Sequence, residues 1–463
     1  MSEPSASPLA APDATPEGAA TPKLQRVLGL GDLLFYGLVL LQPVGIIGLF
    51  GVGTRMSHGH MATSILIAMV AMMITAVSYG RMAALYPSAG SAYTYVGRGL
   101  NPHLGFLAGW AMVLDYLIIP IVNVTYGAIS AERLLPAVPY WAWVLIIGLG
   151  MTFLNVRGIR ATARANQVLM AAMVVVAVAF VIAAVRYLFQ TAGWHGLVSL
   201  APFYDPATFN FGDACTATSF AAAAYVGFDG ITTLAEDAIQ PKRTVPLATV
   251  LVCLVTGLTA ILLAYLAQRV SPSSDRFTDV DSMFMDIAAM AGGPWLFNAI
   301  AVIMAVTCFG SGLTGQVGAA RLLYSMGRDN VLPRAIFGRL DRHNAPTLNI
   351  WLIGAVALIG AFPRKYALAT CLINFGAFLA FMGVNAAAIR TYWFSPPPGY
   401  RRQWLTDIVV PALGLLFCLW IWCSLPRPAQ VVGAIWFVMG LLYAAVLTRG
   451  FRRRPAMLDF SES

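Results

Sequence analysis

Carboxylates inside an apolar stretch are the residues most suited to chemistry in this chain. Residues 219–237 read SFAAAAYVGFDGITTLAED, an apolar run that nevertheless contains Asp229, Glu236 and Asp237. A charge at the centre of a bilayer costs about 2.5–3.5 kcal/mol even on the lenient insertion scale. Gly227 and Gly230 interrupt the run, and an interrupted, acidic membrane segment is typical of a transport site.

The acids of this segment differ in what they predict. Asp229, Thr232, Thr233 and Glu236 follow the i, i+3, i+4, i+7 spacing of one helix face, which is suited to guiding a cation or carrying a proton. The alternative is that the last acids lie at the cytoplasmic interface and pair with basic residues of the next loop. We favour that alternative for Asp237 and a functional role for Glu236, and both readings stay open for Asp229.

A second interruption lies near the start of the chain. The apolar residues 31–53 contain Pro43, which lacks a backbone donor, and Gly45 and Gly48, which loosen the helix after it. An ordinary proline kink is the alternative. Broken helices leave backbone groups free at membrane depth, and two facing breaks make a polar pocket for a small zwitterion or cation. We expect its backbone to come from Pro43, Val44, Gly45 and Ile46 on one side, and Ala223, Ala224, Tyr225, Val226 and Gly227 on the other.

Two further spans contain polar residues that are candidates for the pocket. In residues 104–130, Tyr116 shares a helix face with Asn123, so Tyr116 is expected at the substrate. Asp115 lies on another side of that helix and is either a coupling residue or paired within the bundle. In residues 295–325, Ser311 and Thr314, together with Gln316, are candidate oxygen ligands for a sodium ion, although the glycines around them also predict close helix packing.

The elements that position these residues are predicted to be membrane-spanning helices. The chain has 463 residues, is 59% hydrophobic and only 11% charged, and a soluble domain could not bury so much apolar surface. A span needs about 20 mostly apolar residues. Twelve candidates follow: 31–53, 61–84, 104–130, 140–156, 166–189, 212–234, 246–268, 295–325, 348–362, 367–391, 409–424 and 428–448.

Topology explains the net charge of +9 better than nucleic-acid binding does. With a cytoplasmic N-terminus, the outer segments hold only eight of the 29 Lys and Arg residues, as the positive-inside rule requires: Arg55, Arg133, Arg186, Arg269, Arg276, Arg364, Lys365 and Arg427. Both termini are therefore expected in the cytoplasm of a cell with a bacterial-type inner membrane. Residues 1–26 are predicted to be a disordered tail and 449–463 a basic tail.

The spacing of the two interruptions predicts an inverted repeat. Five spans separate one break from the next, and an odd number of spans per repeat forces opposite orientations. The expected transporter core is 27–391, with repeats 31–189 and 212–391. The two accessory spans in 392–448 are suited to packing or dimerisation, which leaves a homodimer open.

Several stretches together resemble the amino acid–polyamine–organocation superfamily over residues 25–450. They are YPSAGSAYTY (86–95), GLNPHLGFLAGW (99–110), GFDGITTLAED (227–237), RLLYSMGRDNVLP (321–333) and LINFGAFLAF (372–381). Within it the chain is most similar to bacterial putrescine importers. The resemblance implies an all-α, LeuT-type fold with ten core helices, a midplane site, alternating access and proton-driven uptake. It also implies substrate roles for Tyr116 and Glu236.

Three positions depart from that pattern. Gly48 stands where putrescine importers of this type have an acid, which favours a different amine or an amino acid. Met173 stands where some amino acid members have a lysine, and Ala223 stands near the position of a gating aromatic residue.

The combined expectation is an all-α secondary transporter of the inner membrane that imports a small amine or amino acid together with protons. An exchanger of the same superfamily, a sensor that binds without transporting and a channel are the alternatives. No phosphate loop, nucleophile–base pair or metal-like cluster is present in the sequence, so neither enzymatic activity, nor a cofactor, nor a metal is expected. The expected partners are the substrate, protons or sodium, and the lipid bilayer.

Overall fold

The computed structural model describes residues 27–87, 90–158, 163–235, 237–328, 332–341 and 345–452. Within these residues the fold is built from helices, and the extended pairing is an isolated bridge between Leu28 and Ala238. The predicted tail 1–26 lies outside the described residues, as do residues 453–463 of the predicted basic tail 449–463 and Glu236.

The first half of the chain contains a broken helix followed by long apolar helices. The elements are α1 (Leu30–Leu41), a 3₁₀ turn η1 (Pro43–Gly45), α2 (Ile46–Met56), α3 (Met61–Leu85), α4 (Ser91–Gly99), α5 (Pro102–Leu134), α6 (Tyr140–Val156) and α7 (Ala163–Leu197). α7 changes direction at Gly193, whose φ of 57° is in the left-handed region that glycine tolerates.

The second half begins with another broken helix. Its elements are α8 (Phe211–Ala221), two 3₁₀ segments η2 (Ala222–Tyr225) and η3 (Phe228–Leu234), α9 (Pro241–Val270), α10 (Met283–Gly292), α11 (Pro294–Arg328), α12 (Arg334–Phe337), α13 (Thr347–Ala361) and α14 (Tyr366–Ile389). Two π-helical segments, η4 (Arg390–Phe394) and η5 (Leu405–Val409), then lead to α15 (Val410–Cys423) and α16 (Arg427–Leu447).

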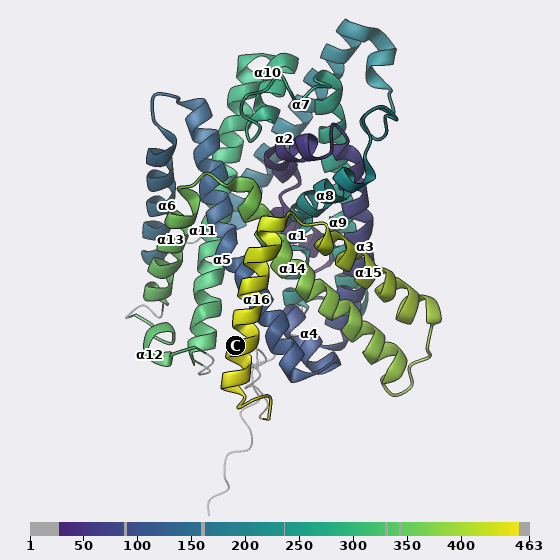
Figure 1. The fold of residues 1–463 in the computed structure, drawn as a ribbon, viewed down its shortest axis with the longest axis vertical. Helices are drawn as coiled ribbons and strands as arrows, with labels where there is room; N and C mark the ends of the chain where they lie inside the picture. The colour runs from purple at the N-terminus through teal and green to yellow at the C-terminus, as the bar shows by residue number, and fades with distance from the viewer. Residues whose placement is uncertain are drawn as a thin grey trace, which may run out of the picture.

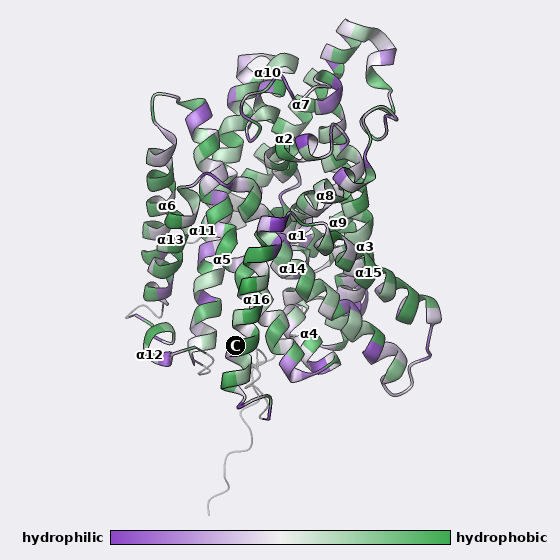
Figure 2. Cartoon of the chain, in the orientation of Figure 1, coloured by the Kyte–Doolittle hydropathy of each residue, from purple (hydrophilic) through white to green (hydrophobic). Residues whose placement is uncertain are grey.

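Nine helical segments of the described chain are long and apolar enough to cross a membrane. Helices also occupy the other three predicted ranges, but α6 and α13 are shorter and the segment at 212–234 is broken. Figure 1 shows α10 and the upper end of α7 at one end of the bundle, with α4 and α12 at the other. In Figure 2 hydrophobic residues cover the lengths of the helices, and hydrophilic residues gather toward the two ends. That distribution fits a bundle that spans a bilayer.

The centre of the bundle is formed by helices distant in sequence. α3 packs extensively against α9, and α5 against both α11 and α14. The glycines of α11 allow it to approach both α5 and α6 closely. A Cβ on Gly315 would lie 2.6 Å from Ile119 of α5, and one on Gly312 would lie 2.7 Å from Met151 of α6. The predicted packing role of these glycines is therefore confirmed.

A buried ion pair connects α3 to the segment between α14 and α15. The Arg81 guanidinium donates to the Asp407 carboxylate over 2.5 Å and to the Tyr400 hydroxyl over 2.8 Å, and it stacks 3.9 Å from the ring centroid of Tyr392. Asp407 is fully buried. The contacts hold the accessory helices against the core.

Arg81→Ala should lower the free energy of unfolding by about 3–5 kcal/mol, because it leaves the buried Asp407 carboxylate without its cation. Thermal unfolding of the purified protein in detergent measures the loss. The double variant Arg81→Met/Asp407→Leu should recover most of it, since removing both partners leaves no unpaired charge. Equal melting temperatures for Arg81→Ala and the wild type would contradict this role.

Candidate functional site

The first helix is broken at the predicted position. α1 ends at Leu41, and Gln42 adopts φ 48° and ψ 80° before the single 3₁₀ turn Pro43–Gly45. Pro43 cannot donate a backbone hydrogen bond, and the residue before a proline disfavours the α region. The interruption is a change of helix direction and type, so the prediction of a break rather than a simple kink is confirmed.

The second break is also where the sequence places it. α8 ends at Ala221, Val226 is extended, and Gly227 has φ 111°, which favours glycine. Side chains on both sides of the break bind backbone carbonyl groups: Asn374 of α14 donates its side-chain amide to the Ser219 carbonyl of α8 over 2.6 Å, and the Tyr225 hydroxyl of the break donates to the Ile65 carbonyl of α3 over 3.2 Å. Buried backbone groups at membrane depth require such partners.

The polar stripe predicted after this break is wrong in its geometry. Residues Phe228–Leu234 form a 3₁₀ helix with about three residues per turn. The Thr232 hydroxyl donates to the Asp229 carbonyl over 2.6 Å, and the Thr233 hydroxyl donates to the Gly230 carbonyl over 2.7 Å. Thr232 is fully buried, whereas Asp229 and Thr233 line a cavity.

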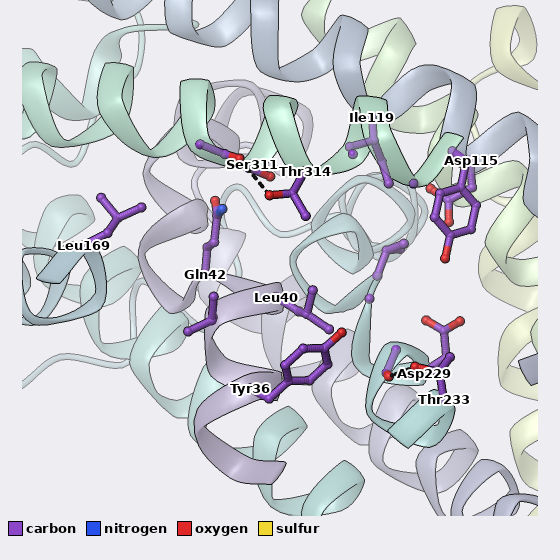
Figure 3. A pocket seen from close by; sticks show the side chains of 18 of the residues that line it. Tyr36, Leu40, Gln42, Asp115, Ile119, Leu169, Asp229, Thr233, Ser311 and Thr314 are labelled. Atoms are coloured by element: carbon purple, nitrogen blue, oxygen red, sulfur yellow. Dashed lines mark hydrogen bonds between the residues drawn. The ribbon is translucent and has the colours of Figure 1, made fainter. Parts of the chain in front are cut away.

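That cavity has a volume of about 290 Å³ and lies between the two breaks, α5, α7 and α11 (Figure 3). The volume suits a small organic molecule. Its lining residues are Tyr36, Val39, Leu40, Gln42, Asp115, Tyr116, Ile119, Leu169, Met170, Met173, Val226, Gly227, Asp229, Gly230, Thr233, Gly310, Ser311, Thr314, Gly315 and Gly318.

The cavity brings together part of the predicted site. The predicted residues that line it are Asp115, Tyr116, Val226, Gly227, Asp229, Ser311 and Thr314. Those that lie at the breaks but are not among its lining residues are Pro43, Val44, Gly45, Ile46, Ala223, Ala224 and Tyr225, of which Val44, Ile46, Ala224 and Tyr225 are buried. Glu236, the acid favoured from the sequence, is outside the described residues.

Three expectations about individual side chains need correction. Asp115 lines the same cavity as Tyr116, although their positions on the helix predicted different sides. Asn123 instead donates to the Ile119 carbonyl of its own helix over 2.9 Å. Gln316 contacts α6 and α13, donating to Thr152 over 2.9 Å and to the Ile350 carbonyl over 3.0 Å, so its amide is committed away from the cavity.

Two carboxylates dominate the electrostatics of the cavity. Asp115 is 8% exposed, and its Oδ1 has no hydrogen-bond partner among the described residues. Asp229 accepts a long hydrogen bond of 3.4 Å from the Ser91 hydroxyl of α4. The residues that line the described cavity include no Lys, Arg or His. The site therefore favours a cation, because an uncompensated carboxylate in a low-dielectric interior is costly.

Sequence reasoning missed two polar residues of the cavity, Tyr36 and Gln42, both from the first broken helix. Gln42 directly precedes Pro43, and a polar residue at that place was the available signal, since a proline disfavours the α region for the residue before it. Tyr36 had no such signal within an apolar run. Met173, noted as a departure from some relatives, also lines the cavity.

Gly48 lies where an added side chain has little space. A Cβ there would lie 2.9 Å from the Tyr366 hydroxyl and 3.0 Å from the Tyr126 ring. Gly51, one turn later, has its nearest neighbour at the Val280 carbonyl oxygen, 1.9 Å from a built Cβ. α2 thus packs directly on residues 271–282. An acid at Gly48 would not fit this arrangement, because its side chain would meet Tyr366 and Tyr126.

Charged residues lie near the contact between α2 and residues 271–282, at the end of the molecule where α10 lies. Arg364 bridges Glu132, 2.7 Å away, and Asp279, 2.8 Å away. Arg133 pairs with Asp286. Burial, together with the neighbouring Asp279 carboxylate, raises the pKa of Asp281 to about 6, against the opposing effect of Arg364. This end is the predicted outer side, so these groups meet external pH.

Asp281→Asn should remove a pH dependence of stability. Because the folded-state pKa of Asp281 is raised, its contribution is present below its ordinary pKa near 4 and is lost as pH rises through about 6. At pH 7.5 the variant should be more stable than the wild type by about 1–2 kcal/mol, after allowance for solvent screening. Melting temperatures at pH 5 and 7.5 test this.

The matched control for Asp281→Asn is Asp275→Asn, an exposed carboxylate in the same loop. It should leave the wild-type difference between the two pH values in place. A difference in melting temperature that persists in Asp281→Asn would show that another group causes it.

Comparison with known proteins agrees with this architecture. Residues 38–446 match the family model for amino acid permeases. The chain is 34% identical to the low-affinity putrescine importer PlaP of Escherichia coli over 93% of this chain and 95% of the relative. It is 24% identical to the branched-chain amino acid permease BcaP of Bacillus subtilis, over 92% and 94% of the two chains.

The family match covers most of the chain, and these relatives are transporters rather than enzymes. The apolar helices agree with a multi-pass protein of the plasma membrane. The chain belongs to the amino acid permease family, within the amino acid–polyamine–organocation superfamily.

Proposed function

We propose that this protein is a secondary transporter that imports a small amine or an amino acid, with an amine as the preferred class. The cavity carries the proposal: it lies between two broken helices and presents two carboxylates, Asp115 and Asp229, with no cationic side chain among its described lining residues. An ammonium group complements both acids. The putrescine importer named above is a relative of matching length, which supports the same class.

An amino acid is the second candidate substrate. Its carboxylate would need donors. The backbone amides of Gly227 and Gly230 at the break face the Asp229 carboxylate, so an amino acid carboxylate would have to compete with Asp229 for them. The Tyr36 and Tyr116 hydroxyls are further donors on the cavity wall. The branched-chain permeases among the relatives support this alternative.

Proton coupling is the proposed energy source. Asp115 is almost completely buried and has an unpartnered oxygen in the described structure, so a proton or a substrate cation must compensate its charge. Among the described residues of α11 that line the cavity, Ser311 and Thr314 are the two with hydroxyl groups. Two hydroxyls are few for a sodium site, so protons are preferred over sodium. A substrate role for Glu236, which lies outside the described residues, remains part of this proposal on the strength of the family resemblance alone.

The proposed architecture has twelve spans with both termini in the cytoplasm. The repeats 31–189 and 212–391 form an inverted pair, each beginning with a broken helix, and 392–448 adds two accessory spans. Transport would proceed by rocking of spans one, two, six and seven against three, four, eight and nine. The similar breaks at Gln42–Gly45 and Ala222–Gly227 support this pairing. A homodimer through the accessory spans is compatible with it.

Uptake by the purified protein in proteoliposomes tests the function. Labelled putrescine should accumulate under an inward proton gradient, and unlabelled putrescine, spermidine and the common amino acids should be compared as competitors. A protonophore should abolish accumulation. Counterflow without net uptake would identify an exchanger instead, and binding without any flux would identify a sensor.

A further inference from the structure

Gln42 has an uncommon backbone conformation at the cavity. Its φ of 48° lies in the left-handed region, which costs roughly 1–2 kcal/mol for a residue with a side chain. Its backbone N–H donates to the Leu38 carbonyl over 3.0 Å. Its side chain lines the cavity, and no hydrogen bond joins the side-chain amide to another of the described residues. Strain of this kind at a break is often retained for function.

The cavity has two chemically different ends. Gly318 of α11 lies beside Tyr116, with a built Cβ 3.5 Å from its ring, so this part of α11 marks the end with Asp115. Ser311 lies seven residues earlier on the same helix, which is about 10 Å along its axis. In Figure 3 Gln42 points toward Ser311 and Thr314, well apart from Asp115 and Asp229.

The end at Gln42 is polar but uncharged. The Thr314 hydroxyl donates to the Gly310 carbonyl over 3.1 Å, so its oxygen remains free to accept. The Gln42 amide offers one carbonyl oxygen and two N–H donors. An ammonium, hydroxyl or amide group on a substrate can bind there, whereas an alkyl end would leave these groups unpaired.

We propose that Gln42 is a specificity-determining residue that binds the far end of the substrate while Asp115 and Asp229 bind its near ammonium group. This inference rests on the proposed transport function and adds a requirement to it: the substrate carries a polar group at each end, separated by a short chain. Gln42 thereby selects against monoamines with an apolar end, which the carboxylates alone cannot reject.

The role of Gln42 is tested by competition, in which unlabelled amines that differ only at one end inhibit the uptake of labelled putrescine. Wild-type protein should prefer putrescine over 1-butylamine by about tenfold or more, since a hydrogen bond to a charged group is lost. Gln42→Leu should reduce the ratio of the affinities for putrescine and 1-butylamine toward one, mainly by weakening the binding of putrescine. Gln42→Glu should increase the preference for putrescine over 4-amino-1-butanol, because it adds a charge at the far end.

Gln240→Leu is the matched control. Gln240 also precedes a proline and has φ 52°, but it is exposed and is not one of the cavity residues. The Gln240→Leu variant should therefore show the same preference for putrescine over the other amines as the wild type. Melting temperatures of all variants exclude unfolding as the cause of a change.

The outcomes separate the two proposals. A wild type that neither binds nor transports any amine or amino acid refutes the transport function. A wild type that transports amines with no preference between putrescine and butylamine, or a Gln42→Leu variant with an unchanged ratio, refutes the role of Gln42 alone. If amino acids are the substrates, glutamine and norleucine make the same comparison of polar and apolar ends.

Discussion

Asp229→Asn is expected to reduce uptake of a cationic substrate by on the order of 100-fold or more. The carboxylate lies at the cavity, next to a break that leaves few other charges to compensate an ammonium group. Removing one partner of a buried, hydrogen-bonded charge pair costs about 2–5 kcal/mol in binding. Initial uptake rates in proteoliposomes across a range of substrate concentrations measure the effect, which should appear as a higher KM for putrescine.

The control for Asp229→Asn is Asp213→Asn, in the first turn of α8 before the break. Asp213 is exposed and lies 3.4 Å from His58. Its replacement should leave uptake close to wild type, because exposed pairs contribute little. Near-normal putrescine uptake by Asp229→Asn would refute its contact with the substrate, and the cationic preference of the cavity would then depend on Asp115.

Gly51→Ala should nearly abolish transport while substrate binding persists. A Cβ at this position would lie 1.9 Å from the Val280 carbonyl oxygen and 3.0 Å from the Met283 side chain, so α2 could no longer pack on residues 271–282. That contact lies at the predicted outer side. Under the proposed alternating access, a protein unable to make it cannot close its outer side, although an outward-open cavity can still bind.

Two measurements separate this effect from misfolding. Putrescine should still raise the melting temperature of Gly51→Ala in detergent, whereas uptake in proteoliposomes should fall to background. Gly31→Ala is the control, since a Cβ there meets open space within 4 Å. Wild-type uptake by Gly51→Ala would mean that the close contact between α2 and the Val280 carbonyl is not required in the cycle.

The helices and their interruptions were predictable because they depend on local sequence. Apolar runs of sufficient length specify membrane helices. Proline at position 43 and glycine at position 227 specify breaks, because one lacks a donor and the other tolerates φ 111°. The family resemblance, confirmed by the match over residues 38–446, follows from the same stretches of sequence.

The errors concern which way side chains face around those breaks. The spacing after Gly227 predicts a polar stripe on an α-helix, but Phe228–Leu234 is a 3₁₀ helix with about three residues per turn, so its side chains face other directions. Asp115 and Tyr116 both reach the cavity because it lies against a broad side of α5. For Gln42, the place before Pro43 indicates an irregular backbone, but the contact of its side chain with the cavity depends on the tertiary structure.

The sequence by itself determined that this protein is a helical membrane permease with two interrupted helices and acids beside one of them. Periodicity, apolar length, proline and glycine are local properties, and they are sufficient for that conclusion. Only the tertiary structure decided which residues share the cavity, because α1, α5, α7, α11 and the segment after α8 meet there through long-range packing. That packing brings Asp115, Asp229 and Gln42 to one cavity, although their spacing along the sequence does not predict that they meet.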